Sequence, residues 1–539
     1  MDFIDEIARR RTFGIISHPD AGKTTLTEKF LLFGGAIQEA GAVKSNKVKK
    51  SAISDFMEIE RQRGISVSTS VLSFEYQNKK INILDTPGHK DFAEDTFRTL
   101  TAVDSVIVVI DVAKGVEEQT EKLVEVCRMR QIPIIVFINK LDREGQDAFD
   151  LLDELEQKLH LTVVPLSWPI GMGINFQGIY NLRKQNLLLS AGEKKHKIET
   201  AIELKELHHQ RLDDIIGTEA AAKLREDLQI IQEIYPSFEH EAYLNAELQS
   251  VFFGSALNNF GIRELLDAFI EIAPSPYSKA SDQRLVRAEE KRFTGFVFKI
   301  HANMDPKHRN RIAFVKVASG TFKRNTFYLH VRLRQKFKYA SPSAFFADKK
   351  QLVEQSFPGD IVGLHDTGNF KIGDTLTEGE ILHFKGIPSF SPEHFRYINN
   401  SDPMKAEQLE KGIDQLMDEG VAQLFTIEHT GRKIIGTVGA LQYEVIQYRL
   451  EHEYGTKCAY EPLPVHKACW IETDDEKDPE FQEFKRIKQR FLARDKHGRL
   501  VFMADSAFSI EMVHEKYPKV RLRFTSEKIS PIAETSLTL

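Results

Sequence analysis

The sequence has few of the features that mark disulfide-linked, metal-binding or membrane proteins. Its 539 residues include three cysteines, Cys127, Cys458 and Cys469, and none has a partner at metal-ligand spacing. The longest apolar run, Ser105–Ala113, is too short to span a bilayer and contains Asp111. The N-terminus is charged from its second residue, unlike a signal peptide. We therefore expect buried reduced thiols, a cytoplasmic location and no membrane partner.

Internal repeats and low-complexity tracts are also absent from the sequence. The composition, with 41% hydrophobic and 28% charged residues, is that of an ordinary globular protein, and the length predicts several domains. The net charge of −6 hides a basic block, Lys291–Lys338, in which 13 Lys and Arg face one acid, Asp305. Such a block predicts a phosphate-rich partner, although a solvated face is the alternative.

Strand-like and helix-like segments alternate through the first half of the chain. Apolar runs at Ser105–Asp111, Ile132–Asn139 and Thr162–Leu166 alternate with helical patterns at Gln119–Arg130 and Ala148–Leu159. This alternation predicts an α/β domain with a doubly wound, mostly parallel sheet. Loops at the carboxyl ends of such strands form the ligand crevice.

Changes of pattern divide the rest of the chain. The first domain contains an insertion at about 171–249, for which Ile198–Ile234 predicts a largely helical structure. Short strands with turn signals then predict an all-β barrel, and mixed helices and strands predict an α+β domain after it. A linker is expected at Pro274–Gln283. The expected segments are 1–273 for the α/β domain, 284–385 for the barrel, 393–525 for the α+β domain and 526–539 for a disordered tail.

The segment Ser17–Thr24 (SHPDAGKT) follows a β-rich run and fits a phosphate-binding loop. Backbone N–H groups at the start of the next helix would surround the phosphates. Lys23 would reach the β- and γ-phosphates, and the Thr24 hydroxyl would bind Mg²⁺. The predicted contact residues are Ser17, His18, Pro19, Asp20, Ala21, Gly22, Lys23 and Thr24.

The segment Asp85–His89 (DTPGH), with Thr86 and Pro87, ends another strand. Asp85 would support Mg²⁺ through water. Gly88 would let its N–H approach the γ-phosphate, and the His89 imidazole would orient the attacking water or stabilise charge. Upstream, in Glu58–Ser70, the hydroxyl of Ser66 would complete the Mg²⁺ shell. The residues predicted here to be catalytic are His89, Lys23 and Gly88.

Two further segments predict guanine as the base. The carboxylate of Asp142 would accept from two adjacent guanine N–H groups, which adenine does not offer. Asn139 would tie its loop to the phosphate loop, and the Lys140 stem would lie over the purine. The predicted base-site residues are Asn139, Lys140, Leu141, Asp142, Ser255, Ala256 and Leu257. The ligand is therefore expected to be GTP or GDP with Mg²⁺.

The segments HPDAGKT (His18–Thr24), ERQRGIS (Glu60–Ser66) and DTPGH together resemble the translational GTPases that act on the ribosome, in particular the elongation factor G branch. That family usually has Thr where this chain has Ser66. Three further segments resemble the bacterial class II peptide chain release factors: SWPIG at Ser167–Gly171, Phe293–Phe314 and Val438–Gly455.

The resemblance implies a GTP-binding domain, an elongation-factor-type barrel and a ferredoxin-like α+β domain. It implies ribosome-stimulated GTP hydrolysis that promotes dissociation of a class I release factor after peptide release. The implied partners are ribosomal RNA and proteins and, functionally, the class I factor, with no DNA partner and a monomeric state. The resemblance also adds Asp20 to the predicted catalytic residues, because it implies that Asp20 helps to hold a monovalent cation near the β- and γ-phosphates.

Two alternatives stay open. One is another elongation factor G-like GTPase that acts in elongation or ribosome rescue. The other is a GTP-sensing binding module without turnover. His89 and the Lys23–Thr24 pair favour hydrolysis, because binding alone does not need a group that orients water.

Overall fold

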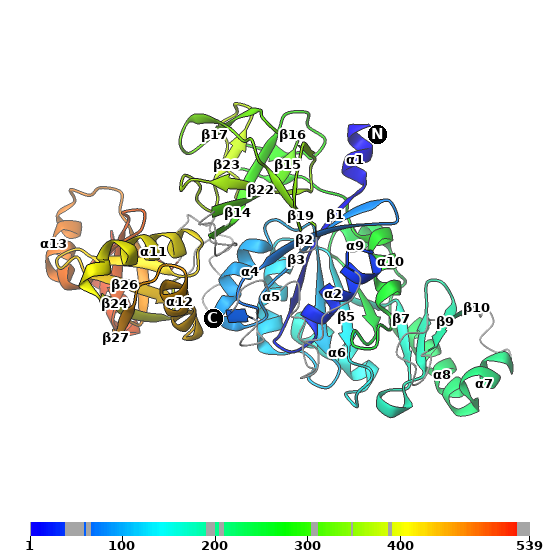
Figure 1. Ribbon diagram of the computed structural model, residues 1–539. Coiled ribbons are helices and arrows are strands. Elements are labelled where there is room, and N and C mark those ends of the chain that lie inside the picture. The colour runs from blue at the N-terminus through cyan, green and yellow to red at the C-terminus, as the bar shows by residue number, and fades with distance from the viewer. Residues whose placement is uncertain are drawn as a thin grey trace.

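The computed structural model describes residues 2–37, 59–60, 66–189, 200–203, 210–302, 311–346, 349–385 and 391–524, and the expected tail at 526–539 lies outside them. Figure 1 shows three bodies, which we call the α/β region (3–272), the barrel region (294–377) and the C-terminal region (394–523). This is the multidomain fold class that the sequence predicts. Within the described residues, none of the helices combines the length and the apolar character that a membrane span requires.

Seven neighbouring strands form the sheet of the α/β region. In sheet order they are β2 (Ser70–Tyr76), β3 (Lys79–Asp85), β1 (Arg10–Ser17), β4 (Ser105–Asp111), β5 (Ile134–Asn139), β11 (Gln249–Phe253) and β6 (Val163–Pro165). Only β2 is antiparallel to its neighbour β3. Their tight turn consists of Gln77 and Asn78, both with positive φ, as a two-residue hairpin requires. The predicted mostly parallel sheet is confirmed.

Helices cover both faces of this sheet because successive side chains of each strand point to opposite faces. In β4, Val106 and Val108 join a core with α5 and α6, whereas Ile107 and Val109 join another with α2 and α10. The helices of the region are α1 (Phe3–Ala8), α2 (Lys23–Phe33), α4 (Ala93–Thr99), α5 (Glu118–Met129), α6 (Ala148–Leu159), α9 (His240–Leu244) and α10 (Ile262–Ile272). The strands are buried on both sides, which explains their continuous apolar sequence.

The insertion contains a small antiparallel sheet as well as helices. Its strands are β7 (Ser167–Ile170), β8 (Gly178–Asn181), β9 (Asn186–Leu189) and β10 (Thr200–Glu203), followed by helices α7 (Gln210–Ile216) and α8 (Thr218–Ile234). The helical expectation for Ile198–Ile234 is therefore wrong at Thr200–Glu203, which pairs with β9. Four-residue strands of this kind carry too few alternations to stand out in a sequence. Buried Trp168 donates to Asp227 (3.0 Å) and so fastens α8 to the sheet.

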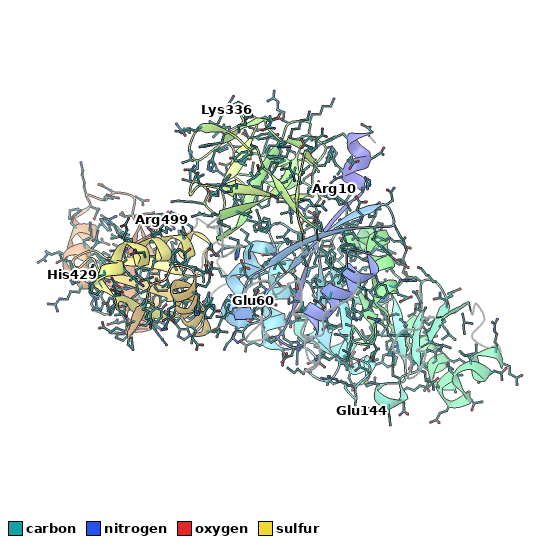
Figure 2. The ribbon with its side chains drawn as sticks, viewed as in Figure 1. Arg10, Glu60, Glu144, Lys336, His429 and Arg499 are labelled. Atoms are coloured by element: carbon teal, nitrogen blue, oxygen red, sulfur yellow. The ribbon has the colours of Figure 1, made fainter. Side chains whose placement is uncertain are left out.

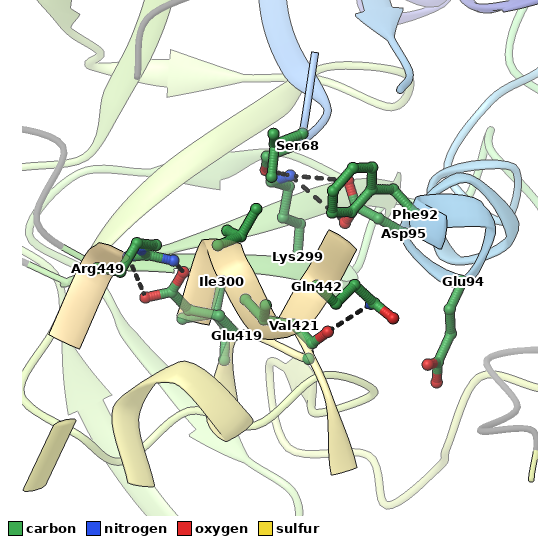
Figure 3. A pocket seen from close by; sticks show the side chains of 13 residues that line it. Ser68, Phe92, Glu94, Asp95, Lys299, Ile300, Glu419, Val421, Gln442 and Arg449 are labelled. Carbon is green, nitrogen blue, oxygen red and sulfur yellow. Dashed lines mark hydrogen bonds and ion pairs between the residues drawn. The ribbon is translucent and has the colours of Figure 1, made fainter. Parts of the chain in front are cut away.

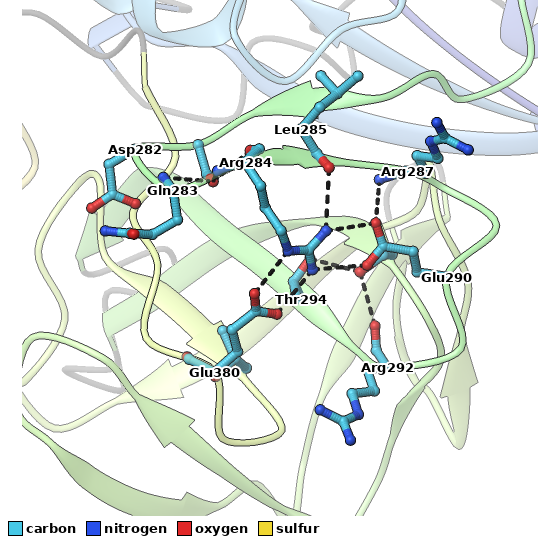
Figure 4. A network of polar contacts seen from close by, with 12 residues as sticks. Asp282, Gln283, Arg284, Leu285, Arg287, Glu290, Arg292, Thr294 and Glu380 are labelled. Atoms are coloured by element: carbon cyan, nitrogen blue, oxygen red, sulfur yellow. Dashed lines mark hydrogen bonds and ion pairs between the residues drawn. The ribbon is translucent and has the colours of Figure 1, made fainter.

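The segment expected to be a linker ends in ordered structure. Strand β12 (Lys279–Ala280) pairs with β13 (Leu285–Val286). Between the two strands the Arg284 guanidinium bonds to the carboxylates of Glu380 and Glu290, at 2.7–2.9 Å (Figure 4). These hydrogen bonds raise the pKa of Arg284. The connection is thereby fixed to the barrel region.

The barrel region consists of short antiparallel strands around an apolar core that includes Phe293, Val297 and Tyr328. Its strands are β14 (Thr294–Ala302), β15 (Arg311–Ser319), β16 (Phe322–Lys323), β17 (Phe327–His330), β18 (Gln335–Lys338), β19 (Ser343–Phe346), β20 (Lys349–Leu352), β21 (Gln355–Ser356), β22 (Ile361–Asp366) and β23 (Thr375–Thr377). Strand β19 also pairs with β2, so the barrel continues the edge of the α/β sheet.

The C-terminal region has the expected ferredoxin-like order of elements, but it has it twice. The first unit is β24 (His394–Asn400), α11 (Ala406–Asp418), β25 (Gln423–Ile427), β26 (Lys433–Thr437), α12 (Leu441–His452) and β27 (Cys458–Pro462). The second is β28 (Lys467–Glu472), α13 (Pro479–Lys488), β29 (Leu492–Asp495), β30 (Leu500–Ala504), α14 (Ala507–Lys516) and β31 (Arg521–Arg523). The two units pair through β25 and β29 into one eight-stranded sheet. The sequence predicts one ferredoxin-like unit here and shows no internal repeat.

Candidate nucleotide-binding site

The four sequence motifs meet at one edge of the α/β sheet. Ser17, Asp85 and Asn139 are the last residues of β1, β3 and β5, and Ser255 lies just after β11. These strands lie in the order β3, β1, β4, β5, β11, and they are all parallel. Their carboxyl ends therefore form one crevice, where doubly wound sheets bind ligands.

The phosphate loop needs left-handed backbone at two positions. Asp20 has φ 68° and Gly22 has φ 100°. A Cβ at Gly22 would lie 2.3 Å from the Asn139 amide, so both the conformation and the close approach require glycine. Helix α2 begins at Lys23, and the Gly22 N-cap provides no side-chain acceptor. The first N–H groups of an 11-residue helix are thus directed at the crevice, an arrangement that suits phosphate.

Lys23 and Asp85 form a buried ion pair at the centre of the site. Their side chains are 7% and 1% exposed, respectively. The other Asp85 oxygen, Oδ2, is buried and has no hydrogen-bond partner among the described residues. Thr24, the second residue of α2, is half-buried. This arrangement fits a nucleotide with water-bound Mg²⁺. A phosphate group can replace Asp85 as the partner of Lys23, and Asp85 Oδ2 can then accept a hydrogen bond from a water on the metal.

Asn139 links the base-recognition loops to the phosphate loop. Its amide donates to the Ala21 carbonyl (2.8 Å), and its oxygen accepts from the Ala256 N–H (2.8 Å). The contact between Asn139 and the phosphate loop that the sequence predicts is therefore present. The Ser255 hydroxyl donates to the Asp142 carboxylate. Asp142 itself is half-buried, and these contacts orient it at the rim of the crevice.

Lys140 has a partner that the sequence analysis missed. Its ammonium bonds to Asp111 Oδ2 (2.6 Å) and to the Asp20 carbonyl (2.5 Å). Burial raises the pKa of Asp111, but the hydrogen bonds from Lys140 and the Ala113 N–H and the positive charge of Lys140 together outweigh it, and the pKa lies below its usual value. Asp111 is the last residue of β4, the strand between the motif-bearing strands. Its position at the end of this strand was the sequence signal that could have identified Asp111 as a site residue.

The segment after Asp85 lies on the phosphate loop. The buried Thr86 hydroxyl donates to the Ile15 carbonyl (2.7 Å), and a Cβ at Gly88 would lie 3.4 Å from Pro19 N. The His89 side chain is 33% exposed. Its Nδ1 accepts from the Asp91 N–H (3.2 Å), which fixes the ring at the start of a short turn, η1 (Lys90–Phe92).

His18 differs from His89 in that its ring is fully buried. Neither ring nitrogen has a hydrogen-bond partner within the described part of the chain. Glu117 Oε2 lies 3.4 Å from Nδ1. Burial lowers the pKa of His18 in spite of this carboxylate. His18 therefore contributes a neutral ring to the phosphate loop at pH 7.

Ser66 lies at the start of a described segment that is held from both sides. The buried Glu60 carboxylate accepts from the Val67 N–H (2.8 Å) and the Ser68 N–H (3.2 Å). Thr69 donates its N–H and its hydroxyl to Asp95 on α4, each at 2.7 Å. The remainder of the predicted Glu58–Ser70 segment, Glu58 and residues 61–65, lies outside the described residues.

The basic block divides into buried and exposed members. Lys299, Arg311 and Lys316 are buried and paired with Asp95, with Asp366 and Asp418, and with Asp104, respectively. These charges serve internal contacts and are not available to an external partner. The exposed members include Arg334, Lys336 and Lys338, and Lys336 lies at the outer end of the barrel region (Figure 2). Residues 303–310, with Lys307 and Arg309, lie outside the described residues.

Comparisons with known proteins identify a family for each region. Residues 8–275 match the elongation factor Tu GTP binding domain. Residues 292–379 match elongation factor G domain 2, and residues 384–514 match the C-terminal domain of class II release factor RF3. A crystal structure of a protein from Thermus thermophilus superposes with a TM-score of 0.69 at 21% sequence identity. The match covers 86% of this chain and 71% of the Thermus chain, and at this identity the likeness concerns the fold alone.

Proposed function

The chain is a translational GTPase of the elongation factor G type that carries the class II release factor RF3 C-terminal domain, and from this premise we propose its function. It hydrolyses GTP in response to the ribosome and promotes departure of a class I release factor after the peptide is freed. It acts in the cytoplasm as a monomer. The observation that supports the proposal is that one chain carries both the crevice where the four motifs meet and the match to the release factor C-terminal domain at 384–514.

The residues of the crevice have separate roles in this proposal. Lys23 exchanges Asp85 for the β- and γ-phosphates, which the N-terminus of α2 also holds. Magnesium, when bound, neutralises developing phosphate charge, and Thr24, Ser66 and, through water, Asp85 would hold it. Asp20 would hold a monovalent cation at the same phosphates.

The attack and the base are handled by other residues. Gly88 presents its N–H to the γ-phosphate, and His89 orients the attacking water. Asp142 accepts from the two guanine N–H groups. Guanine selection and hydrolysis thus depend on different loops and can be separated by substitution.

The experiment uses post-termination ribosomes that carry a fluorescent class I factor. Departure of the factor is recorded with GTP, GDP or a non-hydrolysable GTP analogue. We expect departure with GTP, and one round of it with the analogue, because binding of the GTP state shifts the ribosome between conformations. Stimulation of translocation without departure would instead identify an elongation-type GTPase.

Two variants provide the controls. Asp142→Asn should respond to xanthosine triphosphate and not to GTP, because its amide donates where the carboxylate accepted. His89→Ala should bind GTP within a few fold but lose roughly two decades of stimulated turnover. A ribosome that stimulates no turnover in the wild-type protein would refute the enzymatic proposal and favour a GTP-sensing module.

A further inference from the structure

Asp91 provides the hydrogen bond that holds the imidazole of His89, and the Phe92 ring lies nearby with its centroid at 6.2 Å. The Asp91 N–H donates to His89 Nδ1 (3.2 Å), and Asp91 Oδ1 lies 3.3 Å from the same nitrogen. A neutral ring that accepts at Nδ1 carries its proton on Nε2. The orientation of the ring and its tautomer therefore depend on the place of Asp91.

The place of Asp91 depends in turn on the C-terminal region. Its Oδ2 accepts from the Leu441 N–H (2.8 Å), the first N–H of α12, 350 positions away in the chain. The Asp91 carboxyl group also lies against Gly439: a Cβ there would meet its Cγ at 1.9 Å. The Asp91 side chain is 6% exposed, so water does not replace these contacts readily.

The Gln442 side chain ties the backbone around Gly439 to another segment of the C-terminal region. The Gln442 side-chain oxygen accepts from the Val438 and Gly439 N–H groups, and its amide donates to the Val421 carbonyl (2.6 Å; Figure 3). The Leu441 N–H therefore moves together with the C-terminal region.

An apolar cluster joins the same elements. Phe92, the next residue after Asp91, packs with Val445 of α12 and with Ile59 and Val67. Figure 3 shows Phe92 beside Asp95, whose carboxylate faces Lys299, and Gln442 of α12 lines the same pocket. Ile59, Val67 and the turn after His89 therefore share one small core with α12.

We propose that Asp91 is a positioning residue through which α12 of the C-terminal region sets the orientation of His89 for hydrolysis. This inference rests on the proposed function, because it assigns to His89 a role in GTP turnover. Any shift of the C-terminal region relative to α4 moves Leu441 and Gly439, and with them the carboxylate beside the imidazole. Hydrolysis is thereby coupled to the placement of the C-terminal region.

Four variants test the coupling. Asp91→Ala removes the carboxylate, and Asp91→Asn keeps an oxygen for the Leu441 N–H. Gly439→Ala adds a methyl group that displaces the Asp91 carboxylate from the C-terminal side, and its φ is not in the left-handed region. Ala440→Ser, at the exposed next residue, is the matched control.

The kinetic readout is ribosome-stimulated hydrolysis. We expect Asp91→Ala and Gly439→Ala each to lower kcat about tenfold, as for a misplaced catalytic group, with the KM for ribosomes and the nucleotide affinity within about twofold. Asp91→Asn should keep at least half of the wild-type kcat. The double variant should be no slower than either single variant, because both substitutions break one path.

A second readout does not need ribosomes. Nitrogen-15 spectra of histidine-labelled protein, with the His89 signal assigned by its loss in His89→Gln, report which ring nitrogen carries the proton. The wild-type protein and Ala440→Ser should show the proton on Nε2, whereas Gly439→Ala should show a mixture of tautomers. Unchanged His89 signals in Gly439→Ala, a wild-type kcat, or faster hydrolysis in either variant would overturn the inference. If the wild-type protein showed no turnover, the proposed function would be refuted. The spectra would still test whether the place of Asp91 sets the tautomer of His89.

Discussion

The barrel region and the C-terminal region both pack on the α/β region, but they do so through different chemistry. At the barrel interface, buried Asp104 pairs with Lys316 (2.8 Å) and lies 3.5 Å from the Lys279 ammonium. Buried Asp360 pairs with Arg10 (2.8 Å) and Lys80 (2.9 Å). Charges from both sides are thus removed from water and joined to each other.

The C-terminal region contacts α4 and its preceding turn through hydrogen bonds from or to its backbone groups and through the apolar contact of Phe92 with Val445. The Arg98 guanidinium donates to the Gly420 carbonyl (2.8 Å), and Asp91 accepts from the Leu441 N–H. Both contacts lie beside glycines that leave room for the partner side chain. The second unit, with α13, lies farther from the α/β region (Figure 1).

The difference teaches which interface can move. Separating the barrel from the α/β region would expose several buried charges or leave them buried without their partners. Each buried charge that loses its partner costs several kcal/mol. A hydrogen bond between a charged side chain and a backbone group contributes only about 1.5–3 kcal/mol net. A shift of the C-terminal region would also break the ion pair between Arg311 and Asp418, but Arg311 would keep its pair with Asp366. We therefore expect the barrel to stay fixed to the α/β region while the C-terminal region changes its position.

The largest effect is expected from Asp104→Ala, which leaves the Lys279 and Lys316 ammonium groups buried without their carboxylate. Burial already lowers the pKa of both lysines, against the opposing effect of Asp104. The free energy of unfolding should fall by about 3–5 kcal/mol, the usual cost of breaking a buried pair. Urea unfolding measures it. Asp213→Ala, which breaks a partly exposed pair with Arg225 in the insertion, is the control and should leave the midpoint unchanged.

A smaller loss of stability is expected when acid protonates Asp360. Burial raises its pKa, but Lys80 and Arg10 outweigh burial and lower it to about 2. Because the folded pKa lies below the unfolded one, this stabilisation is present above about pH 4 and is lost as pH falls toward 2; it amounts to about 2 kcal/mol. Asp360→Asn should be less stable than wild type at pH 7 and should lose less between pH 4 and 2. Parallel pH dependences in urea titrations would contradict this assignment.

Gly420→Ala should loosen only the C-terminal region. Gly420 has φ 74°, and a Cβ would lie 2.0 Å from Arg98 Nη1. We expect about 1–2 kcal/mol of lost docking, seen as a longer mean distance between dyes on Lys122→Cys and Lys516→Cys. The three native cysteines are buried and should not label. Gly431→Ala has the same backbone strain (φ 69°) with open space at its Cβ, and the distance should not change.

The smallest effect on stability is expected for the exposed basic residues of the barrel. Arg334, Lys336 and Lys338 replaced by Ala should leave the unfolding midpoint unchanged, since they pair with no buried group in the described structure. Ribosome binding should weaken, and its salt dependence should flatten by up to about one counterion per lost phosphate contact. An unchanged salt slope would show that this face is merely solvated.

The sequence by itself determined the α/β sheet and the positions of the nucleotide loops. Each motif is contiguous and follows a buried apolar strand, and parallel strands bring their carboxyl ends to one edge without further information. The Asn139 link to the phosphate loop followed from the same reasoning. Asp111 was missed because a single aspartate at a strand end carries no motif of its own.

Only the tertiary structure decided what the remaining charges do and how the C-terminal region is built. Lys299 and Lys316 read as parts of a basic surface, yet they are buried against acids far away in the chain. The doubled ferredoxin-like unit leaves no repeat in the sequence, because strand order depends on pairing and burial, which different side chains satisfy equally well. The bond between Asp91 and Leu441 spans 350 positions. Contacts of this kind arise from packing between regions, and no local pattern encodes them.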